Sequence, residues 1–164
     1  MGSGKSYVGK RLAEQLDFQF IDLDAYLEQK TQRTISTIFE EEGEDYFRNL
    51  ERACLYEMAS FENIVVSTGG GTPCFFDNIQ WIRENGISVF LKPDINLMVQ
   101  RLKSETDKRP LLADQDAVTL RDFIQDKLRQ RLPYYNQATV TIPITASNQK
   151  EIVEMILIQL NLEI

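Results

Sequence analysis

The chain has 164 residues, of which 43% are hydrophobic and 26% charged, and its 18 basic and 25 acidic residues give a net charge of −7. This length and composition fit one globular domain with its own core and exclude disordered and collagen-like chains. The sequence contains no histidine, which excludes Ser-His-Asp and Cys-His catalysis and every His-ligated zinc site.

Short β-rich runs alternate with longer helical patterns along the chain, which is typical of a three-layer α/β domain with a mainly parallel sheet. We predict strands over 18–21, 64–67, 87–91 and 139–144. We predict helices over 5–16, 24–30, 35–60, 77–85, 94–104, 119–137 and 149–161. Four strands are few for such a sheet, so we expect a fifth, central strand before Met1, absent from this chain. The elements otherwise indicate a single domain over 1–164.

The chain begins with MGSGKS, followed by a helical pattern of apolar residues. This is most of the P-loop pattern G-x-x-x-x-G-K-[ST], in which backbone N–H groups surround phosphates, the lysine reaches the β/γ oxygens and the hydroxyl ligates Mg²⁺. The first glycine of the pattern would precede Met1, so we expect roughly ten further residues upstream. A bare GSGKS could also be the remnant of a flexible tag, and the remaining motifs decide between the two interpretations.

The second motif is FIDLD over 20–24, a strand that ends in Asp22 and Asp24. Ligands collect at the carboxyl edge of parallel strands, which would place both carboxylates beside the P-loop. One could hold Mg²⁺ through water while the other faces an acceptor hydroxyl. The alternative is structural: Asp24 could cap the following helix and Asp22 could simply solvate the end of the strand.

The third motif is STGGGTP over 67–73, again directly after a strand. Three consecutive glycines are entropically costly, and a tight turn needs only one or two. The run therefore favours a backbone that approaches a ligand closely, with a plain loop as the alternative.

Three arginines complete the pattern, because only arginine offers a planar fork for carboxylate and phosphate groups. Arg48 lies on a predicted helix, where Glu51 at i+3 can orient its guanidinium. Arg109 opens RPLL between two polar stretches, and Arg131 lies near the end of a helix. The alternative for each is a solvated helix face, which is also our interpretation of the acidic stretch 40–45.

Taken in order, the motifs GSGKS, FIDLD, FRNLE, STGGGT, RPLL and RLPYY resemble those of the shikimate kinase family, and the resemblance covers practically the whole chain. It implies a P-loop α/β fold like that of nucleoside monophosphate kinases, with a mainly parallel five-stranded sheet. It also implies a substrate-binding segment at about 24–60 and a mobile lid at about 104–117.

The resemblance also assigns roles to individual residues. The implied ATP-binding residues are Gly2, Ser3, Gly4, Lys5, Ser6, Tyr7, Arg101 and Arg109. The implied shikimate-binding residues are Asp24, Phe47, Arg48, Gly70, Gly71 and Arg131, with both arginines facing the carboxylate. Ser6 and Asp22 lie on the Mg²⁺ side, and Lys5, Asp24 and Arg109 are the implied catalytic residues.

The implied reaction is in-line transfer of the γ-phosphoryl group of MgATP to the 3-hydroxyl of shikimate, in which positioning and charge neutralisation do most of the work. Asp24 would orient the acceptor hydroxyl and accept its proton. One alternative is another small-metabolite P-loop kinase such as a gluconate kinase. The other is a nucleotide-binding protein without turnover, since the P-loop is incomplete.

The composition also indicates which cellular compartment and which partners to expect. Two cysteines cannot frame a disulfide-rich secreted fold, so we expect reduced thiols in a cytoplasmic protein. The acidic balance, with a pI near 4.7, lacks the basic footprint that nucleic-acid binding needs. No apolar run approaches the roughly 20 residues that span a bilayer, so no membrane partner is expected. The family's usual state is a monomer.

Overall fold

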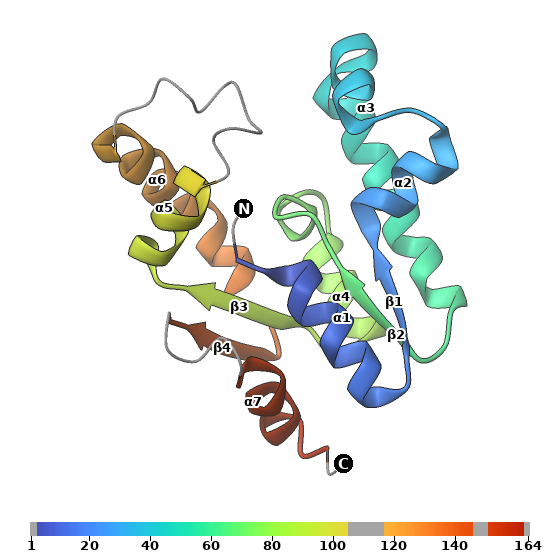
Figure 1. The fold of residues 1–164 in the computed structure, drawn as a ribbon. Helices are drawn as coiled ribbons and strands as arrows, with labels where there is room; N and C mark the ends of the chain where they lie inside the picture. Colours follow the sequence, from blue (N-terminus) through green and yellow to red (C-terminus); the bar gives the residue numbers. More distant parts are fainter. Residues whose placement is uncertain (1–2, 105–116, 146–150, 163–164) are drawn as a thin grey trace. The chain divides into compact units, whose positions relative to one another are not determined.

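The computed structural model describes residues 3–104, 117–145 and 151–162 (Figure 1). The chain forms two compact units. The N-terminal unit covers Lys5–Gly86, and the C-terminal unit covers Ile87–Glu163 together with Met1–Gly4.

Two parallel strands and the helices around them make up the N-terminal unit. Its elements are α1 (Lys5–Leu16), β1 (Gln19–Asp22), α2 (Leu23–Thr31), α3 (Ile35–Glu57), β2 (Ile64–Ser67) and α4 (Asn78–Asn85), with short 3₁₀ turns at Met58–Ser60 and Thr72–Cys74. β1 and β2 pair in parallel, in a register that runs from Gln19 opposite Ile64 to Asp22 opposite Ser67.

Helices cover both faces of β1, because successive side chains of a strand point to opposite faces. On one face Phe20 packs against α1 so closely that a Cβ at Gly9 would lie 2.7 Å from Phe20 Cε2. On the other face Ile21 joins the main core of the unit. The buried members of that core are Ile21, Leu23, Leu27, Ile38, Phe47, Cys54, Leu55 and Met58. The three layers expected from the sequence are therefore present in this unit.

The long helix α3 is not continuous. Gly43 has φ 82° and ψ 178°, which breaks the helical path between Ile35 and Glu57. A left-handed φ is strained for residues with a side chain, and glycine adopts it readily. The helix predicted over 35–60 is thus present from Ile35 to Glu57 but is broken at Gly43, and the acidic stretch 40–45 does not form a single helix face.

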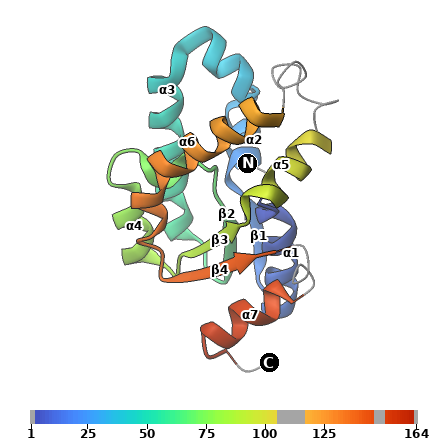
Figure 2. The same ribbon diagram turned by 90° about the vertical axis from the view of Figure 1, so that its left-hand side faces the viewer.

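The C-terminal unit contains a second parallel pair of strands and three helices. Its elements are β3 (Val89–Pro93), α5 (Ile95–Ser104), α6 (Ala117–Tyr135), β4 (Val140–Ile144) and α7 (Ile152–Gln159). β3 and β4 run side by side (Figure 2), with Val89 opposite Val140 and Pro93 opposite Ile144. Met98 of α5 packs against Leu120 and Ile124 of α6 in a small core of its own.

The sequence predicts the element order correctly, and every observed strand begins and ends within two residues of its prediction. An α/β fold with parallel strands is thus confirmed, although the four strands of the described ranges form two pairs. The fifth strand expected before Met1 stays a prediction. Both cysteines are free thiols, with Cys54 buried and Cys74 partly exposed. Within the described ranges, no helix combines the length and the hydropathy that a membrane span requires.

Candidate active site

The parallel register of β1 and β2 brings the start of α2 and the loop after β2 to one edge of the N-terminal unit's sheet. Asp22 ends β1 and lies opposite Ser67, which ends β2. The chain continues from β1 directly into α2, and from β2 into residues 68–71, here called the glycine-rich loop. Because carboxyl ends of parallel strands share an edge, Asp24 in the first turn of α2 and the glycine-rich loop meet there.

Ser6 and Asp22 are in direct contact. The Ser6 hydroxyl, in the first turn of α1, donates a hydrogen bond of 2.8 Å to Asp22 Oδ2. The other carboxylate oxygen, Oδ1, accepts from the backbone N–H of Ala25 at 3.4 Å, so Asp22 is the N-cap of α2. The alternative that Asp24 caps this helix is therefore wrong, because the helix begins one residue before it.

The environment of Asp24 favours its protonated form. Burial is the main cause of a raised pKa at this carboxyl, because it removes water from the ionised group. The negative charges of Asp22 and Glu51 raise the pKa further, whereas the ammonium group of Lys5 opposes them. A carboxylate with this balance accepts a proton more readily than an exposed aspartate does.

Three polar side chains converge on the space that a side chain at position 69 would fill. A Cβ at Gly69 would lie 3.0 Å from Glu51 Oε1, 3.0 Å from Thr72 Oγ1 and 3.1 Å from Asp24 Oδ1. Thr72 donates its hydroxyl to Glu51 Oε1 at 2.6 Å, and both side chains are fully buried. The glycine therefore permits a close approach of two carboxylates and one hydroxyl that a larger residue would prevent.

Arg48 is held by ion pairs and by aromatic rings. Its Nη1 donates to Glu51 Oε2 at 2.8 Å, which confirms the pairing expected from the i, i+3 spacing. The rings of Phe47 and Phe75 lie 5.0 Å and 4.0 Å from the guanidinium carbon. A Cβ at Gly71 would approach Nη1 to 2.7 Å, so the glycine-rich loop lies directly against the guanidinium.

Two other predicted residues lie in the same unit. The carbonyl of Gly70 accepts a weak hydrogen bond from the Cys74 thiol at 3.9 Å. Tyr7 is 58% exposed, and its hydroxyl accepts a hydrogen bond of 2.7 Å from Arg11 Nη1. Tyr7 thus has an exposed ring beside the start of α1.

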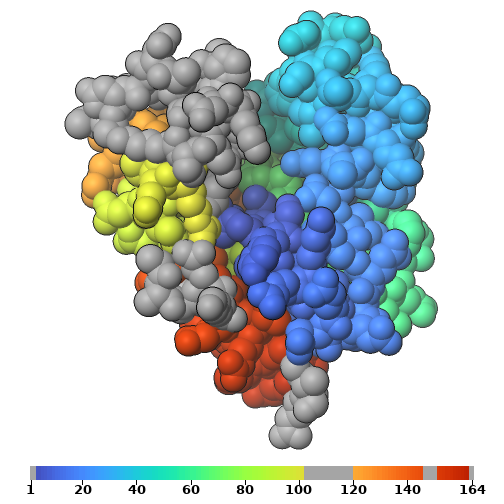
Figure 3. Space-filling view, in the orientation of Figure 1, coloured from blue at the N-terminus to red at the C-terminus, as the bar shows by residue number. Residues whose placement is uncertain are grey.

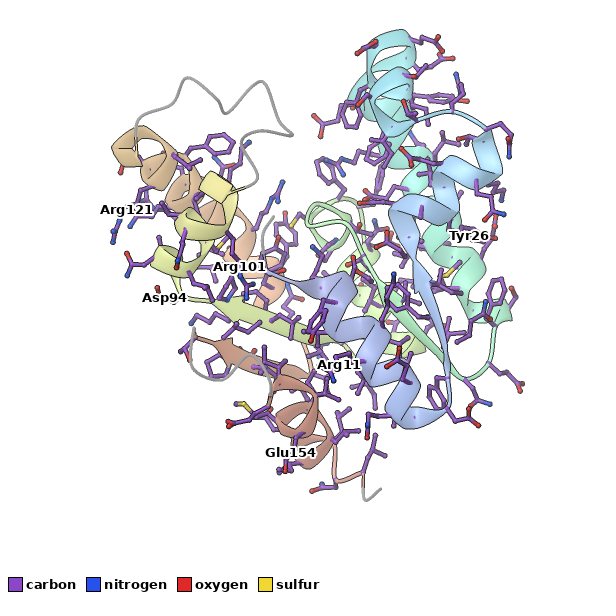
Figure 4. The ribbon with its side chains drawn as sticks, viewed as in Figure 1. Arg11, Tyr26, Asp94, Arg101, Arg121 and Glu154 are labelled. Atoms are coloured by element: carbon purple, nitrogen blue, oxygen red, sulfur yellow. The ribbon has the colours of Figure 1, made fainter. Side chains whose placement is uncertain are left out.

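Four predicted residues of the described ranges belong to the C-terminal unit. Gly4 has φ +80°, and a Cβ there would lie 3.4 Å from Nη1 of Arg101, which comes from α5. The two residues are therefore neighbours, and Figure 4 shows Arg101 on its helix. Arg131 is partly exposed on α6, the helix whose Arg121 donates to Asn96 of α5 at 2.9 Å. Ser3, also partly exposed, precedes Gly4 at a bend of the chain.

Two of the predicted residues, Gly2 and Arg109, lie outside the described residues. The lid expected over 104–117 falls almost entirely outside them as well.

Comparisons with known proteins agree with the motifs. A family model described as shikimate kinase matches residues 1–161. The chain belongs to the shikimate kinase family. A shikimate kinase from Phocaeicola vulgatus is 46% identical to it over 138 residues, which cover 84% of this chain and 79% of that protein. A shikimate kinase from Haemophilus influenzae is 40% identical over 157 residues, covering 95% of this chain and 86% of that one.

Solved shikimate kinases share the fold. The crystal structure of shikimate kinase from Bacteroides thetaiotaomicron matches with a TM-score of 0.90 and 39% identity, covering 98% of this chain and 94% of that one. Shikimate kinase from Acinetobacter baumannii in complex with shikimate matches with a TM-score of 0.85 and 37% identity, covering 99% and 88%. The chain therefore has the P-loop kinase fold of ATP-using shikimate kinases.

The sequence does not single out several residues of this candidate site. The run of three glycines drew attention to the loop, but Gly69 was not singled out, and neither were Thr72 and Phe75. Thr72 contacts Glu51 across 21 positions of sequence, a separation that no local pattern reveals. Glu44, which also contacts Arg48, was assigned to a solvated face. Its i, i+4 spacing to the arginine was the signal that could have found it.

Proposed function

We propose that this protein transfers the γ-phosphoryl group of MgATP to the 3-hydroxyl of shikimate, giving shikimate 3-phosphate and ADP. One observation carries the proposal beyond family membership. A Cβ at Gly69 would lie 3.1 Å from Asp24 Oδ1, and one at Gly71 would lie 2.7 Å from Arg48 Nη1, so the glycine-rich loop lies close to both side chains. A substrate bound on this loop would thus meet a carboxylate suited to a hydroxyl group and a guanidinium suited to a carboxylate.

The start of α1 supports phosphate binding. Lys5 and Ser6 open this helix, whose N-terminus carries a partial positive charge, and Gly4 before it has the left-handed φ of a turn that glycine favours. We assign the triphosphate to Gly2, Ser3, Gly4, Lys5 and Ser6, with Arg109 as a further cation. Tyr7 and Arg101 are the proposed neighbours of the rest of the nucleotide, and the contact between Gly4 and Arg101 supports the second of these.

Ser6 and Asp22 fit a magnesium site. Their oxygens lie 2.8 Å apart, and hydroxyl and carboxylate oxygens are the ligands that Mg²⁺ prefers. The described residues contain no cluster of three or more His, Cys, Asp and Glu side chains that could hold a metal ion. In phosphoryl-transfer sites Mg²⁺ uses one or two protein oxygens together with phosphates and water, so such a cluster is not needed. When bound, the ion would offset negative charge on the phosphates.

Asp24 is the proposed partner of the acceptor hydroxyl. Because its pKa is raised, it accepts the hydroxyl proton more readily than an exposed aspartate would as the oxygen bonds to phosphorus, and the charge of Lys5 partly offsets the rise. Arg48 is fixed by Glu51 and by two aromatic rings, so little conformational freedom remains to be lost on binding a carboxylate. Phe47, Gly70, Gly71 and Arg131 complete the proposed shikimate contacts.

An assay of ADP release tests the proposal. The protein is mixed with MgATP and shikimate, with MgATP and gluconate, or with MgATP alone. Release that depends on shikimate is the expected result. Release with gluconate would point to another small-metabolite kinase, and no release with either acceptor would point to nucleotide binding without turnover.

The proposal includes a monomeric, cytoplasmic enzyme whose partners are its small-molecule substrates. The net charge of −7 supports the absence of a nucleic-acid partner, because phosphate backbones are held by an excess of basic residues. Size-exclusion chromatography with light scattering tests the oligomeric state, and a mass near 19.0 kDa is expected.

A further inference from the structure

The guanidinium of Arg48 is held by a buried carboxylate and by two aromatic rings. Nη1 donates to Glu51, which is only 2% exposed, and Phe47 and Phe75 contribute the two neighbouring rings. The Arg48 side chain itself is 12% exposed. These contacts hold the guanidinium in place and occupy Nη1, so a ligand carboxylate would have to bind an edge that includes Nε or Nη2.

Glu44 occupies such an edge. Its Oε1 accepts from both Nε and Nη2 of Arg48, at 3.1 Å and 2.9 Å. The Nε/Nη2 edge is one of the planar forks with which arginine binds a carboxylate. Glu44 thus occupies, through one oxygen, the edge of Arg48 at which a ligand's carboxylate could bind.

The side chain of Glu44 is placed so that it can move away from Arg48. Its side chain is 53% exposed, in contrast to the buried Glu51 on the same guanidinium. It directly follows Gly43, where α3 is broken and where nothing lies within 4 Å of a Cβ. This stretch, drawn in cyan in Figure 3, lies at the surface of its unit, so movement of Glu44 disrupts no core contact.

Neighbouring acidic residues have a different partner. Glu41 and Glu42 contact Nη1 of Arg33 at 3.3 Å and 3.4 Å. They carry the same charge in the same stretch of α3 but are paired elsewhere. The contact with Arg48 is therefore a property of Glu44 and not of the acidic stretch as a whole.

We infer that Glu44 is an internal competitor for the carboxylate of the substrate: it occupies the Nε/Nη2 edge of Arg48 in the free protein and is displaced when substrate binds. The inference rests on the proposed function, because it takes Arg48 as the carboxylate-binding residue. An exposed i, i+4 ion pair is weak, so the exchange lowers the affinity for substrate without preventing binding. Glu44 is thus a residue that sets how strongly this site holds a carboxylate.

The test compares Glu44→Gln with Glu42→Gln, which removes the same charge from the same stretch. Dissociation constants are measured by calorimetry for shikimate and for its methyl ester, whose carboxylate charge is masked. Removing an exposed competing charge should tighten shikimate binding by about two- to fivefold in Glu44→Gln. Binding of shikimate by Glu42→Gln and binding of the ester by Glu44→Gln should match the wild type.

Three results would overturn the inference: unchanged or weaker shikimate binding by Glu44→Gln, an equal gain in Glu42→Gln, or an equal gain for the ester. The first would mean that Glu44 positions Arg48 instead of competing for it, and the other two would reveal a general charge effect. Failure of the wild type to bind shikimate would overturn the proposed function, and the inference with it. Normal wild-type binding with any of the three results overturns the inference alone.

Discussion

The hydroxyl of Thr72 lies 2.6 Å from Glu51 Oε1, and this hydrogen bond joins the segment that follows the glycine-rich loop to the helix that carries Arg48. The other oxygen of the same carboxylate accepts from Arg48. Glu51 therefore couples the position of the loop to that of the arginine. Asn78 also holds the segment after the loop, since its side-chain amide donates to the Thr72 carbonyl at 2.8 Å.

Replacing Thr72 by valine should weaken both the fold and substrate binding. The change leaves a buried charged acceptor without its hydroxyl donor, which costs about 1.5–3 kcal/mol in free energy of unfolding. We expect a higher KM for shikimate and an unchanged KM for ATP, because Thr72 adjoins the residues proposed to bind shikimate. Urea denaturation and steady-state kinetics measure the two effects. Thr72→Ser keeps the hydroxyl and should restore most of the stability and of the substrate binding. A serine variant as impaired as the valine variant would contradict this explanation.

Replacing Gly71 by alanine should damage the site more than the fold. The new Cβ would lie 2.7 Å from Nη1 of Arg48, and the end of a flexible side chain moves more easily than backbone does. We expect the KM for shikimate to rise about tenfold or more, which corresponds to roughly 1.4 kcal/mol of binding free energy, with little change in Tm. Gly86→Ala is the matched control, because its Cβ would meet only Ile82 O at 3.9 Å. Equal kinetic effects of the two substitutions would refute the steric explanation.

Asp24→Asn should lower kcat by well over tenfold, because the amide cannot accept the hydroxyl proton. For the wild type we expect the acid limb of kcat/KM to have its midpoint above pH 3.8, since burial raises the pKa of Asp24 above that ordinary value. A pH–rate profile checks this. Glu28→Gln is a suitable control, because it removes a nearby charge but keeps the side-chain oxygen that accepts from the Ile35 N–H. A near-wild-type kcat in Asp24→Asn would remove Asp24 from the mechanism.

The same substitution should stabilise the protein at neutral pH. A carboxyl whose pKa is raised in the folded state contributes stability that is present below its unfolded pKa and is lost as pH rises through the folded pKa. The ionised form of Asp24 therefore opposes folding at pH 7, and Asp24→Asn should have a higher Tm than the wild type there. The difference should shrink as the pH is lowered toward 4. A Tm difference that grows on acidification would contradict the raised pKa.

Ser6→Ala should raise the Mg²⁺ concentration needed for half-maximal activity. The substitution removes both the proposed metal-ligating hydroxyl and its hydrogen bond to Asp22, and loss of such groups costs about 10- to 100-fold in metal affinity. The rise in Tm caused by MgADP should also diminish. Ser6→Thr retains the hydroxyl and should behave like the wild type. Normal Mg²⁺ dependence of the alanine variant would refute the assignment.

Local sequence patterns predict much of this molecule, but they do not predict contacts between segments that lie far apart in the sequence. Helical spacing gives α1, and the i, i+3 rule gives the pair of Arg48 and Glu51. The capping of α2 by Asp22 was missed because two aspartates two positions apart compete for one cap, and only the observed start of the helix decides between them. The break at Gly43 had a signal in the low helix propensity of glycine.

Contacts around Gly69 could not be predicted in the same way. They depend on the packing of the core beneath the sheet, which sets the distance from α3 to the loop after β2. The three glycines in the sequence indicate a close approach to the backbone, but they do not indicate which side chain lies against each glycine. Gly69 admits two carboxylates and Gly71 admits a guanidinium, and those identities come only from tertiary structure.

Asp22 of β1 pairs with Ser67 of β2, and this register constrains the length of β1 more strictly than the identity of its residues. Side chains of a strand alternate between faces, so inserting or deleting one residue within β1 would turn Phe20 and Ile21 toward the wrong helical layers. It would also displace Asp22 from Ser6. Substitutions that keep the apolar alternation should therefore be tolerated in these strands, whereas a single-codon deletion should abolish folding and catalysis together.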